Sequence, residues 1–520
     1  DSYQKLIFLP WGCCSCHGYP IAVFFIIMTE FCERFSFYGM RTVLTLYLKN
    51  FLGLSGNVST EVFHGFNMIC YFMPLLGAIV ADGYIGKFKT VVALSTVYVA
   101  GNIVMAVTAI PPAKLAGAVV GLVLIGIGTG GIKPCVSAFG GDQFAQGQEK
   151  QLAQFFSIFY FSINAGALIS TFVTPILRED VECFGGQCFF AAFGLPALLM
   201  LTAIVIFVAG RSMYKVNPPS GNIIGMFFKC IWSAVGNKVK AKKEDQRESV
   251  LDYADDRFSK EFVLDVKGVL RVLVMYLPIP VFWALYDQQG STWTLQAEKM
   301  DGHLGGAFRI KPDQMQAINT VLIIVLIPLF EGAIYPLLDK CRIPNRFVTR
   351  CLPFFTFLAH LLAEVSLSHT VASDYMRGKF INDVPCPTKF TSEFQDTTLK
   401  KFENLSVYTD VPPNTVSMML QIPQYVIITT GEILLSVTGL SFSYAEAPNS
   451  MKSVLQAFWL MTVAFGNLIV LLLNPGCHYT RQTAPSFFLP GLRILGTRTF
   501  LAISCRGTCG ISSARNKKNR

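Results

Sequence analysis

The sequence is poor in charged residues. Asp, Glu, Lys and Arg make up 15% of its 520 residues, whereas soluble domains carry roughly 25%. A chain with so little polar surface is neither intrinsically disordered nor a string of soluble domains. Its hydrophobic fraction is 52%, its mean hydropathy is +0.47 and it contains 44 phenylalanines. The composition therefore indicates an all-α membrane protein.

Acidic residues are missing altogether from the segment 474–520, which has eight basic residues. Without this segment, the chain has 35 basic and 33 acidic residues, and its net charge falls from +10 to +2. The positive charge is thus concentrated at one end and forms no basic stripe along the body. We expect no nucleic acid partner.

The sequence also has no nucleophile motif. Many of its 15 cysteines lie in apolar runs, where Cys behaves as a small hydrophobic residue. Cys13, Cys14, Cys16 and His17 form a cluster, but no further ligands follow at the spacing of a zinc site. Reversible acylation is the alternative use of this cluster. We expect neither an enzyme nor a metal site, and no cofactor.

Long apolar segments are abundant. A helix needs about 20 mostly apolar residues to cross the hydrocarbon, and eleven segments of this kind are present. They lie near 21–48, 62–81, 90–110, 115–135, 155–176, 189–210, 269–286, 316–338, 350–367, 416–439 and 453–473. A charged insert at 211–268 separates the first six from the rest. This layout predicts a major facilitator architecture with 6+6 helices.

The expected organisation follows from these segments. It consists of a cytoplasmic N-terminus (1–20), an N-terminal bundle (21–210), a cytoplasmic linker (211–268), a C-terminal bundle (269–473) with an extracellular loop (368–415), and an atypical basic tail (474–520). A twelfth span is doubtful. Its best candidate, 487–505, is interrupted by Pro490, Arg493 and Arg498, and each central arginine costs roughly 3 kcal/mol on insertion. We expect this segment not to insert.

Short-loop Lys and Arg residues set the orientation of a membrane protein. With the N-terminus inside, the cytoplasmic connections hold Lys87, Lys89, Lys150, the basic linker, Lys340, Arg342 and Arg346. The sequons at Asn57 and Asn404 then both lie outside, as glycosylation requires. Cys183 and Cys188 share an outside loop, where they can form a disulfide.

The first span contains Glu30, Glu33, Arg34 and Arg41. Such charges must pair or face a watery cavity, because each costs roughly 2.5–3.5 kcal/mol at the centre of a bilayer. Glu30, Arg34 and Tyr38 share one helical face, since they are spaced by four residues. A structural ion pair between helices is one interpretation. A proton or substrate site is favoured, because protonation can switch a carboxylate–arginine pair.

Other polar residues extend this candidate site in the first half. His64 opens the second span with Tyr71 two turns later, and it is either an interfacial residue or a proton relay. Lys133 ends a glycine-rich span whose glycines allow close helix contact. There it offers a cation to an anionic group, while Tyr160 and Asn164 can add hydrogen bonds.

In the second half, Arg271 and Glu331 are a plausible pair across two helices. Glu432 has no charged neighbour in its own helix, so it needs a substrate amine or a proton. Lys133 and Glu432 on opposite halves suit a zwitterion with separated charges, such as a peptide. Trp283 and Trp459 are candidate aromatic walls of the binding site, with core packing as the alternative interpretation of Trp459.

Several motifs resemble those of known families. The loop from Asp82 to Lys87 resembles the major facilitator signature whose Asp and Lys anchor the cytoplasmic gate, although a tight turn is the alternative. Other segments resemble signatures of the proton-coupled oligopeptide transporter family, in its animal di- and tripeptide branch. They are EFCERFSFYG at 30–39, GTGGIKP at 128–134 with FGGDQF at 139–144, FFSIFY at 155–160 with INAG at 163–166, and FWALYDQQ at 282–289.

The resemblance implies a symporter of the plasma membrane that imports di- and tripeptides with protons. It assigns proton coupling to Glu30, Glu33, Arg34 and His64. It assigns peptide binding to Tyr38, Tyr71, Lys133, Asn164, Trp283 and Glu432, with the lysine at the peptide carboxylate and Glu432 at its amine. Arg271 and Glu331 match a charge pair that controls gating.

This sequence departs from the family pattern at two of these places. Phe37 replaces the first tyrosine of a usual pair, and Glu331 stands where aspartate is common. Two alternative functions remain open at this point. One is symport of another small anion or zwitterion, such as nitrate or histidine, and the other is a peptide sensor that does not transport.

Overall fold

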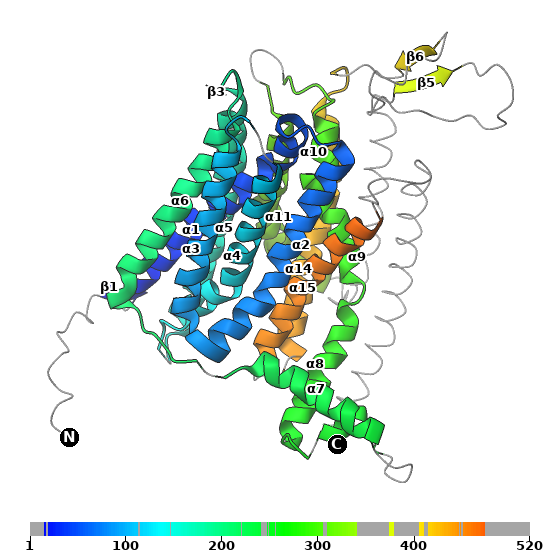
Figure 1. Cartoon of the computed structure of the whole chain (residues 1–520). Helices are drawn as coiled ribbons and strands as arrows, with labels where there is room; N and C mark the ends of the chain where they lie inside the picture. The colour runs from blue at the N-terminus through cyan, green and yellow to red at the C-terminus, as the bar shows by residue number, and fades with distance from the viewer. Residues whose placement is uncertain are drawn as a thin grey trace.

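The computed structural model is a bundle of long helices that run side by side, with one helix lying crosswise beneath them (Figure 1). It describes residues 15–16, 19–112, 115–145, 147–219, 221–240, 247, 249–254, 256–304, 309–340, 374–378, 405–409, 414–446, 448 and 451–473. We call the end of the bundle with the short hairpin β3–β4 the hairpin end, and the end with α7 the linker end.

The first half of the bundle contains six long helices. They are α1 (Ala22–Leu46), α2 (Gly56–Val80), α3 (Lys87–Thr108), α4 (Leu115–Gly141), α5 (Glu149–Glu179) and α6 (Phe189–Ala209). Short π- or 3-10 turns follow three of them: η1 (Tyr47–Phe51), η2 (Ala81–Ile85) and η3 (Gly210–Met213). The hairpins β1–β2 (Ser15–Cys16, Tyr19–Pro20) and β3–β4 (Glu182–Cys183, Gly186–Gln187) are the strands of this half.

The second half has shorter and more broken helices. They are α7 (Ile223–Lys240), α8 (Lys260–Tyr276), α9 (Ile279–Tyr286), α10 (Thr292–Ala297), α11 (Ala317–Leu329), α12 (Tyr335–Lys340), α14 (Ile422–Glu446) and α15 (Lys452–Leu473). The turns are η4 (Val250–Ala254), η5 (Asp287–Gly290), η6 (Pro312–Gln316), η7 (Phe330–Ile334) and η9 (Met418–Gln421). The strands β5 (Asp374–Gly378) and β6 (Leu405–Thr409) pair antiparallel.

Most of the expected spans are present as helices. Within the described residues, eight helices are long and apolar enough to cross a membrane, or nine if the pair Lys260–Tyr276 and Ile279–Ala297, bent by 46°, counts as one span. The helix α1 is excluded from this count by its four charged residues. The expected span at 350–367 and the candidate twelfth span at 487–505 lie outside the described residues, as does most of the cysteine cluster near the start.

Each half of the bundle has its own hydrophobic core. One core is built from residues of α1 to α6, such as Phe37, Phe139 and Phe207. The other is built mainly from residues of α7 to α15, such as Trp293 and Tyr425. It also includes Leu75 and Ala78 of α2. This separation fits the predicted division into two helical bundles, and contacts of α2 with α15 and of α5 with α11 connect them.

Glycines bring α4 against its neighbours, as the sequence predicted. A Cβ placed on Gly77 of α2 would lie 2.2 Å from the backbone oxygen of Gly131. A Cβ on Gly128 would lie 2.5 Å from the Cβ of Tyr98 on α3. Side chains at these crossings would force the helices apart, so the glycines fix the position of Lys133 two residues further along α4.

The seventh span begins earlier than the sequence predicted. The helix α8 starts at Lys260 rather than near 269, because the Ser259 hydroxyl accepts a hydrogen bond from the backbone N–H of Phe262 and caps the helix. The first two turns of α8 contain charged residues, so a search for long apolar segments did not include them. Their buried face is nevertheless apolar, with Val263 and Val266 in the core.

Candidate functional site

The charged residues of α1 form a buried cluster. The Nε of Arg34 lies 2.7 Å from Oε1 of Glu30 and 2.7 Å from Oε2 of Glu33. The three side chains are at most 9% exposed. The predicted pairing of these charges is therefore confirmed, and Arg34 neutralises part of the charge of two carboxylates.

The two oxygens of Glu33 differ in their surroundings. The hydroxyl of Thr129 on α4 donates a hydrogen bond to Oε1 at 2.8 Å. The N–H of Arg34 Nε is directed at Glu30, and Oε2 of Glu33 is buried without a hydrogen-bond donor. A buried carboxylate oxygen in this state has an unmet hydrogen-bonding capacity that a proton would remove.

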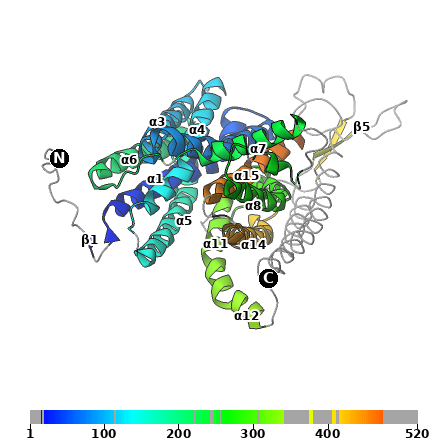
Figure 2. The ribbon, with the colours of Figure 1, turned by 90° about the horizontal axis from the view of Figure 1, so that it is seen from below.

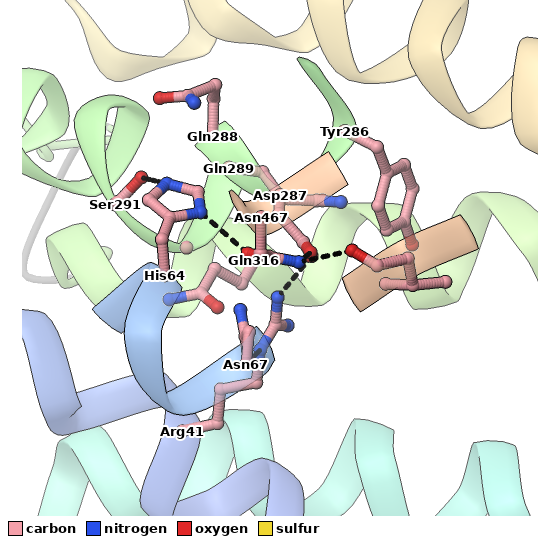
Figure 3. Close-up of polar contacts among 12 residues, drawn as sticks. Arg41, His64, Asn67, Tyr286, Asp287, Gln288, Gln289, Ser291, Gln316 and Asn467 are labelled. Atoms are coloured by element: carbon pink, nitrogen blue, oxygen red, sulfur yellow. Dashed lines mark hydrogen bonds and ion pairs between the residues drawn. The ribbon is translucent and has the colours of Figure 1, made fainter. Parts of the chain in front are cut away.

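His64 lies at the interface between the two halves (Figure 3). Its side chain is fully buried within the protein, so the interpretation of His64 as a polar residue exposed at the membrane boundary is wrong. Its Nδ1 lies 2.7 Å from Oδ1 of Asn467 on α15, and its Nε2 lies 3.0 Å from Oγ of Ser291, next to η5. The Asn467 amide donates to Oδ2 of Asp287 at 2.7 Å, so its oxygen must face the histidine. His64 Nδ1 is therefore the donor, and Nε2 is free to gain a proton.

A cross-half ion pair completes this network. Nη2 of Arg41 on α1 lies 2.8 Å from Oδ1 of Asp287 at the start of η5, and the guanidinium stacks over the Phe63 ring at 5.1 Å. The sequence prediction noted Arg41 but gave it no role, and it did not select Asp287 or Asn467. Asp287 was nevertheless inside the quoted segment 282–289, and Asn467 is a polar residue in an otherwise apolar helix.

A second buried ion pair joins the halves at the hairpin end. Arg178 at the end of α5 donates from Nε and Nη2 to the two oxygens of Asp313 in η6, at 2.9 and 3.1 Å. Both side chains are almost completely buried. The sequence prediction missed this pair, because each residue stands at the border of an apolar run, where charges are common.

Lys133 lies between two aromatic rings. Its Nζ is 3.9 Å from the ring centre of Tyr71 and 4.6 Å from that of Phe37. This arrangement stabilises the ammonium group by cation–π interaction. Phe37, noted above as a departure from the family pattern, therefore contributes a ring face, which does not require the hydroxyl it lacks.

Glu432 lies on the other half of the molecule, in α14. Its Oε2 accepts a hydrogen bond from Nδ2 of Asn319 on α11 at 3.1 Å. The carboxylate also interacts electrostatically with Tyr38 of α1 and Tyr160 of α5. Arg41 interacts electrostatically with both Lys133 and Glu432. The cation and the anion nominated for a zwitterion thus lie on opposite halves, in α4 and α14, and both are within electrostatic range of Arg41.

The remaining nominated binding residues have mixed surroundings. Tyr160 is 49% exposed, and the amide of Asn164 donates to the backbone oxygen of Tyr160 at 2.8 Å. Trp283 is buried and donates from Nε1 to Oγ1 of Thr462 at 3.1 Å. Trp459 packs edge-on against Tyr276, as expected for a core residue. Their roles toward a ligand stay predictions.

Two of the nominated gating residues, Asp82 and Lys87, lie at the connection between α2 and α3. Lys87 pairs at 2.7 Å with Asp142, just after α4. The backbone oxygen of Asp82 accepts a hydrogen bond from Gly221 in the linker at 3.1 Å. Arg271 is exposed on α8, and the Glu331 side chain lies outside the described residues. The pair of Arg271 and Glu331 therefore stays a prediction.

The hairpin end carries the sites expected outside the cell. Cys183 and Cys188, whose pairing the sequence left open, form a disulfide. Asn57 is exposed in the first turn of α2, whereas its sequon partner Ser59 is buried. Asn404 lies outside the described residues. Within the described part of the chain, no three His, Cys, Asp or Glu residues form a group that can hold a metal ion.

Known proteins match this chain over most of its length. The family model PTR2, described as the POT family, matches residues 88–368 and 390–484. Solute carrier family 15 member 2 of Danio rerio is 38% identical, over 92% of this chain and 89% of its own. Member 1 of the same carrier family is 37% identical in Mus musculus and 35% in Homo sapiens, over 92% of each chain in both cases.

Solved structures of the same family have this fold. The POT family transporter PepTSo superimposes with a TM-score of 0.77 and 29% identity, covering 94% of this chain and 99% of its own. An auto-inhibited POT family peptide transporter gives a TM-score of 0.75 and 27% identity, covering 94% and 97%. The sequence resemblance is confirmed, and so is the major facilitator architecture. This chain belongs to the POT family, the proton dependent oligopeptide transporters.

Proposed function

We propose that this chain imports di- and tripeptides in symport with protons. The observation that carries the proposal is the buried cluster on α1, in which Oε2 of Glu33 has no hydrogen-bond donor while Arg34 holds both Glu33 and Glu30. A transported proton bound to Glu33 would cancel its charge and leave Arg34 paired with Glu30 alone. This local change is the proposed coupling step.

The two halves supply opposite charges for the two ends of a peptide. Within the described residues Lys133 makes no hydrogen bond or ion pair, and its Nζ lies over the rings of Tyr71 and Phe37, so its ammonium group retains its donors for a carboxylate. Glu432 offers a carboxylate to the peptide amine. Tyr38, Tyr71, Tyr160, Asn164 and Trp283 surround the space between the charges in this proposal, with Trp459 behind them.

A ligand that contacts both halves favours the state in which they approach each other. Arg41 and Asp287, together with His64, would close the hairpin end, and a proton on His64 Nε2 would turn that nitrogen from an acceptor of the Ser291 hydroxyl into a donor. Asp82, Lys87, Arg271 and Glu331 would act at the linker end. During import, the transporter would alternate between a state closed at the hairpin end and a state closed at the linker end.

The proposed topology places the N-terminus, the linker and α7 in the cytoplasm of a plasma-membrane transporter. The hairpin end is then extracellular, together with the sequons at Asn57 and Asn404. Epitope tags inserted after Gly185 in the hairpin and at the N-terminus test this orientation. Antibody should reach the first tag on intact cells and the second only after permeabilisation. The reverse result would contradict the topology.

Uptake of a radiolabelled dipeptide into proteoliposomes tests the function. We expect accumulation that needs an inward proton gradient and stops with a protonophore. A non-transporting sensor would bind the dipeptide without accumulating it. A carrier of nitrate or histidine would accumulate those solutes and ignore the dipeptide. The membership of the POT family and the paired charges favour peptide symport over both alternatives.

A further inference from the structure

The linker helix α7 has an apolar face that packs on the bundle. Ile224, Phe227, Cys230 and Ala234 are at most 3% exposed and belong to the core of the second half. The Phe227 ring lies 5.8 Å from that of Phe458 on α15. At the far end, the Asn237 amide donates to the backbone oxygen of Tyr253 in η4 at 2.8 Å. These contacts at both ends of α7 define the face that packs on the bundle.

A second apolar stripe on α7 is exposed. Phe228, Trp232, Val235 and Val239 are spaced by four, three and four residues, and their exposed fractions are 42%, 82%, 47% and 81%. At 3.6 residues per turn, this stripe is centred roughly 110° around the helix from the packed face. The indole of Trp232 is the largest apolar group on the stripe. Exposed stripes of this kind mark a surface that contacts a partner.

The rest of α7 is polar and basic. Lys229, Ser233 and Lys240 form a third face, centred roughly 110° around the helix from the exposed stripe. Lys238 adds a further charge, and the helix contains no acidic residue. Its charge therefore complements an anionic surface. A helix with an apolar stripe, a tryptophan and a lysine-rich face is typical of segments that lie in the interface of a membrane.

The position of α7 agrees with this chemistry. The helix lies crosswise at the linker end of the bundle, and seen from below it runs across the underside from the first half toward the second (Figures 1 and 2). It follows α6 and precedes α8, both of which belong to the candidate membrane spans. The level at which spans end is the headgroup region, where tryptophan rings are enriched.

We infer that α7 is a membrane-surface helix that binds an anionic leaflet. Phe228, Trp232, Val235 and Val239 enter the boundary between headgroups and acyl chains, and Lys229 and Lys240 bind the phosphate or carboxylate groups of the lipids. Under the proposed topology this leaflet is cytoplasmic, where anionic lipids lie. The lipid contact is a binding site separate from the peptide site, and it holds the connection between the two halves at the membrane surface.

Quenching of tryptophan fluorescence by brominated lipids tests the inference. The full chain is reconstituted into phosphatidylcholine vesicles with or without 30% phosphatidylglycerol, using lipids brominated near the headgroup or near the chain end. Of the other tryptophans, Trp283, Trp293 and Trp459 are at most 8% exposed. We expect Trp232→Phe to remove at least about half of the quenching by the shallow probe, since an interfacial indole lies close to it.

A double variant supplies the matched control. Trp232→Phe with Ser233→Trp moves the indole to the lysine-bearing face of the same turn, and its quenching should match that of Trp232→Phe alone. Lys229→Gln with Lys240→Gln should remove the dependence on phosphatidylglycerol. Dipeptide binding by each variant verifies folding. Equal quenching of the original chain and Trp232→Phe would place the stripe against protein and overturn the inference, as would strong quenching of the double variant.

Discussion

Arg41 and Asp287 join the two halves of the molecule through a buried contact of 2.8 Å, and Asp287 simultaneously accepts the amide that orients His64. One carboxylate thus pairs with an arginine of α1 and, through Asn467, controls a histidine of α2. Under the proposed function, a change in the charge of His64 would reach the Arg41–Asp287 contact through Asn467. Proton binding and closure of the hairpin end would then be linked through the Asp287 side chain.

Asp287→Asn tests this link. The substitution retains the shape of the side chain but leaves Arg41 buried and unpaired, which costs about 3–5 kcal/mol in the closed state. We expect proton-driven dipeptide accumulation to be lost while the protein still reaches the membrane. Lys49→Gln, which removes a partly exposed pair with Glu298, is the control and should retain uptake within about threefold. Comparable losses in both variants would contradict the assigned role.

His64→Gln tests the histidine as a proton relay. Glutamine can hydrogen bond to Asn467 and Ser291 but cannot take up a proton. We expect the stimulation of uptake by acidic outside pH to disappear. Ser291→Ala removes only the Nε2 partner and should retain a pH-stimulated uptake. A His64→Gln variant with unchanged pH stimulation would exclude the relay.

Glu33→Gln separates coupling from binding. The amide fills the same space beside Arg34 but takes up no proton, so we expect no accumulation against a gradient. Exchange of labelled for unlabelled dipeptide should remain measurable, because Glu33 is not assigned to the ligand. Thr129→Val removes the hydrogen bond to the other oxygen and serves as a packing control. Loss of exchange together with accumulation would place Glu33 in the binding site.

Lys133→Ala tests the carboxylate contact. We expect weaker binding of a dipeptide with a free carboxylate by at least about tenfold, since a buried charge-assisted contact is lost. Binding of the matching dipeptide amide should change much less. Phe37→Leu removes one ring face but keeps the ammonium group, so it should affect both ligands equally. Equal losses for both ligands in Lys133→Ala would reject the contact.

Gly77→Val tests the crossing of α2 and α4. Its side chain would collide with the backbone of Gly131, and overpacking of this kind costs about 1–3 kcal/mol. We expect a lower melting temperature in detergent and loss of uptake. Gly65→Val on the same helix, where a Cβ meets nothing within 4 Å, is the matched control and should behave like the original chain.

Proton symport also predicts an electrical signal. One charge that crosses 100 mV gains about 2.3 kcal/mol, which supports roughly fifty-fold accumulation of a neutral dipeptide. Addition of a neutral dipeptide to expressing cells should therefore produce an inward current. Accumulation without current would contradict the proposed coupling.

The sequence predicted the features that depend on local patterns. Apolar runs located ten described spans, and the spacing of Glu30 and Arg34 predicted their ion pair. The sequence did not predict contacts between residues that are far apart in the chain. Asp287 and Asn467 are separated by 180 residues, and Arg178 and Asp313 by 135. No periodicity within a helix identifies such partners, because three-dimensional packing alone brings them together.

The two separate hydrophobic cores have a thermodynamic consequence for the transport cycle. The cross-half contacts of Arg41, Arg178 and His64 are polar, so water can hydrate these groups when the halves separate. Apolar exposure raises heat capacity and polar exposure lowers it. Opening of the hairpin end should therefore lack the large positive change in heat capacity that exposure of an apolar core gives. A plot of the equilibrium between the two closures against temperature should accordingly show little curvature. These polar contacts between the halves let each half move as a unit without exposing its own hydrophobic core to water.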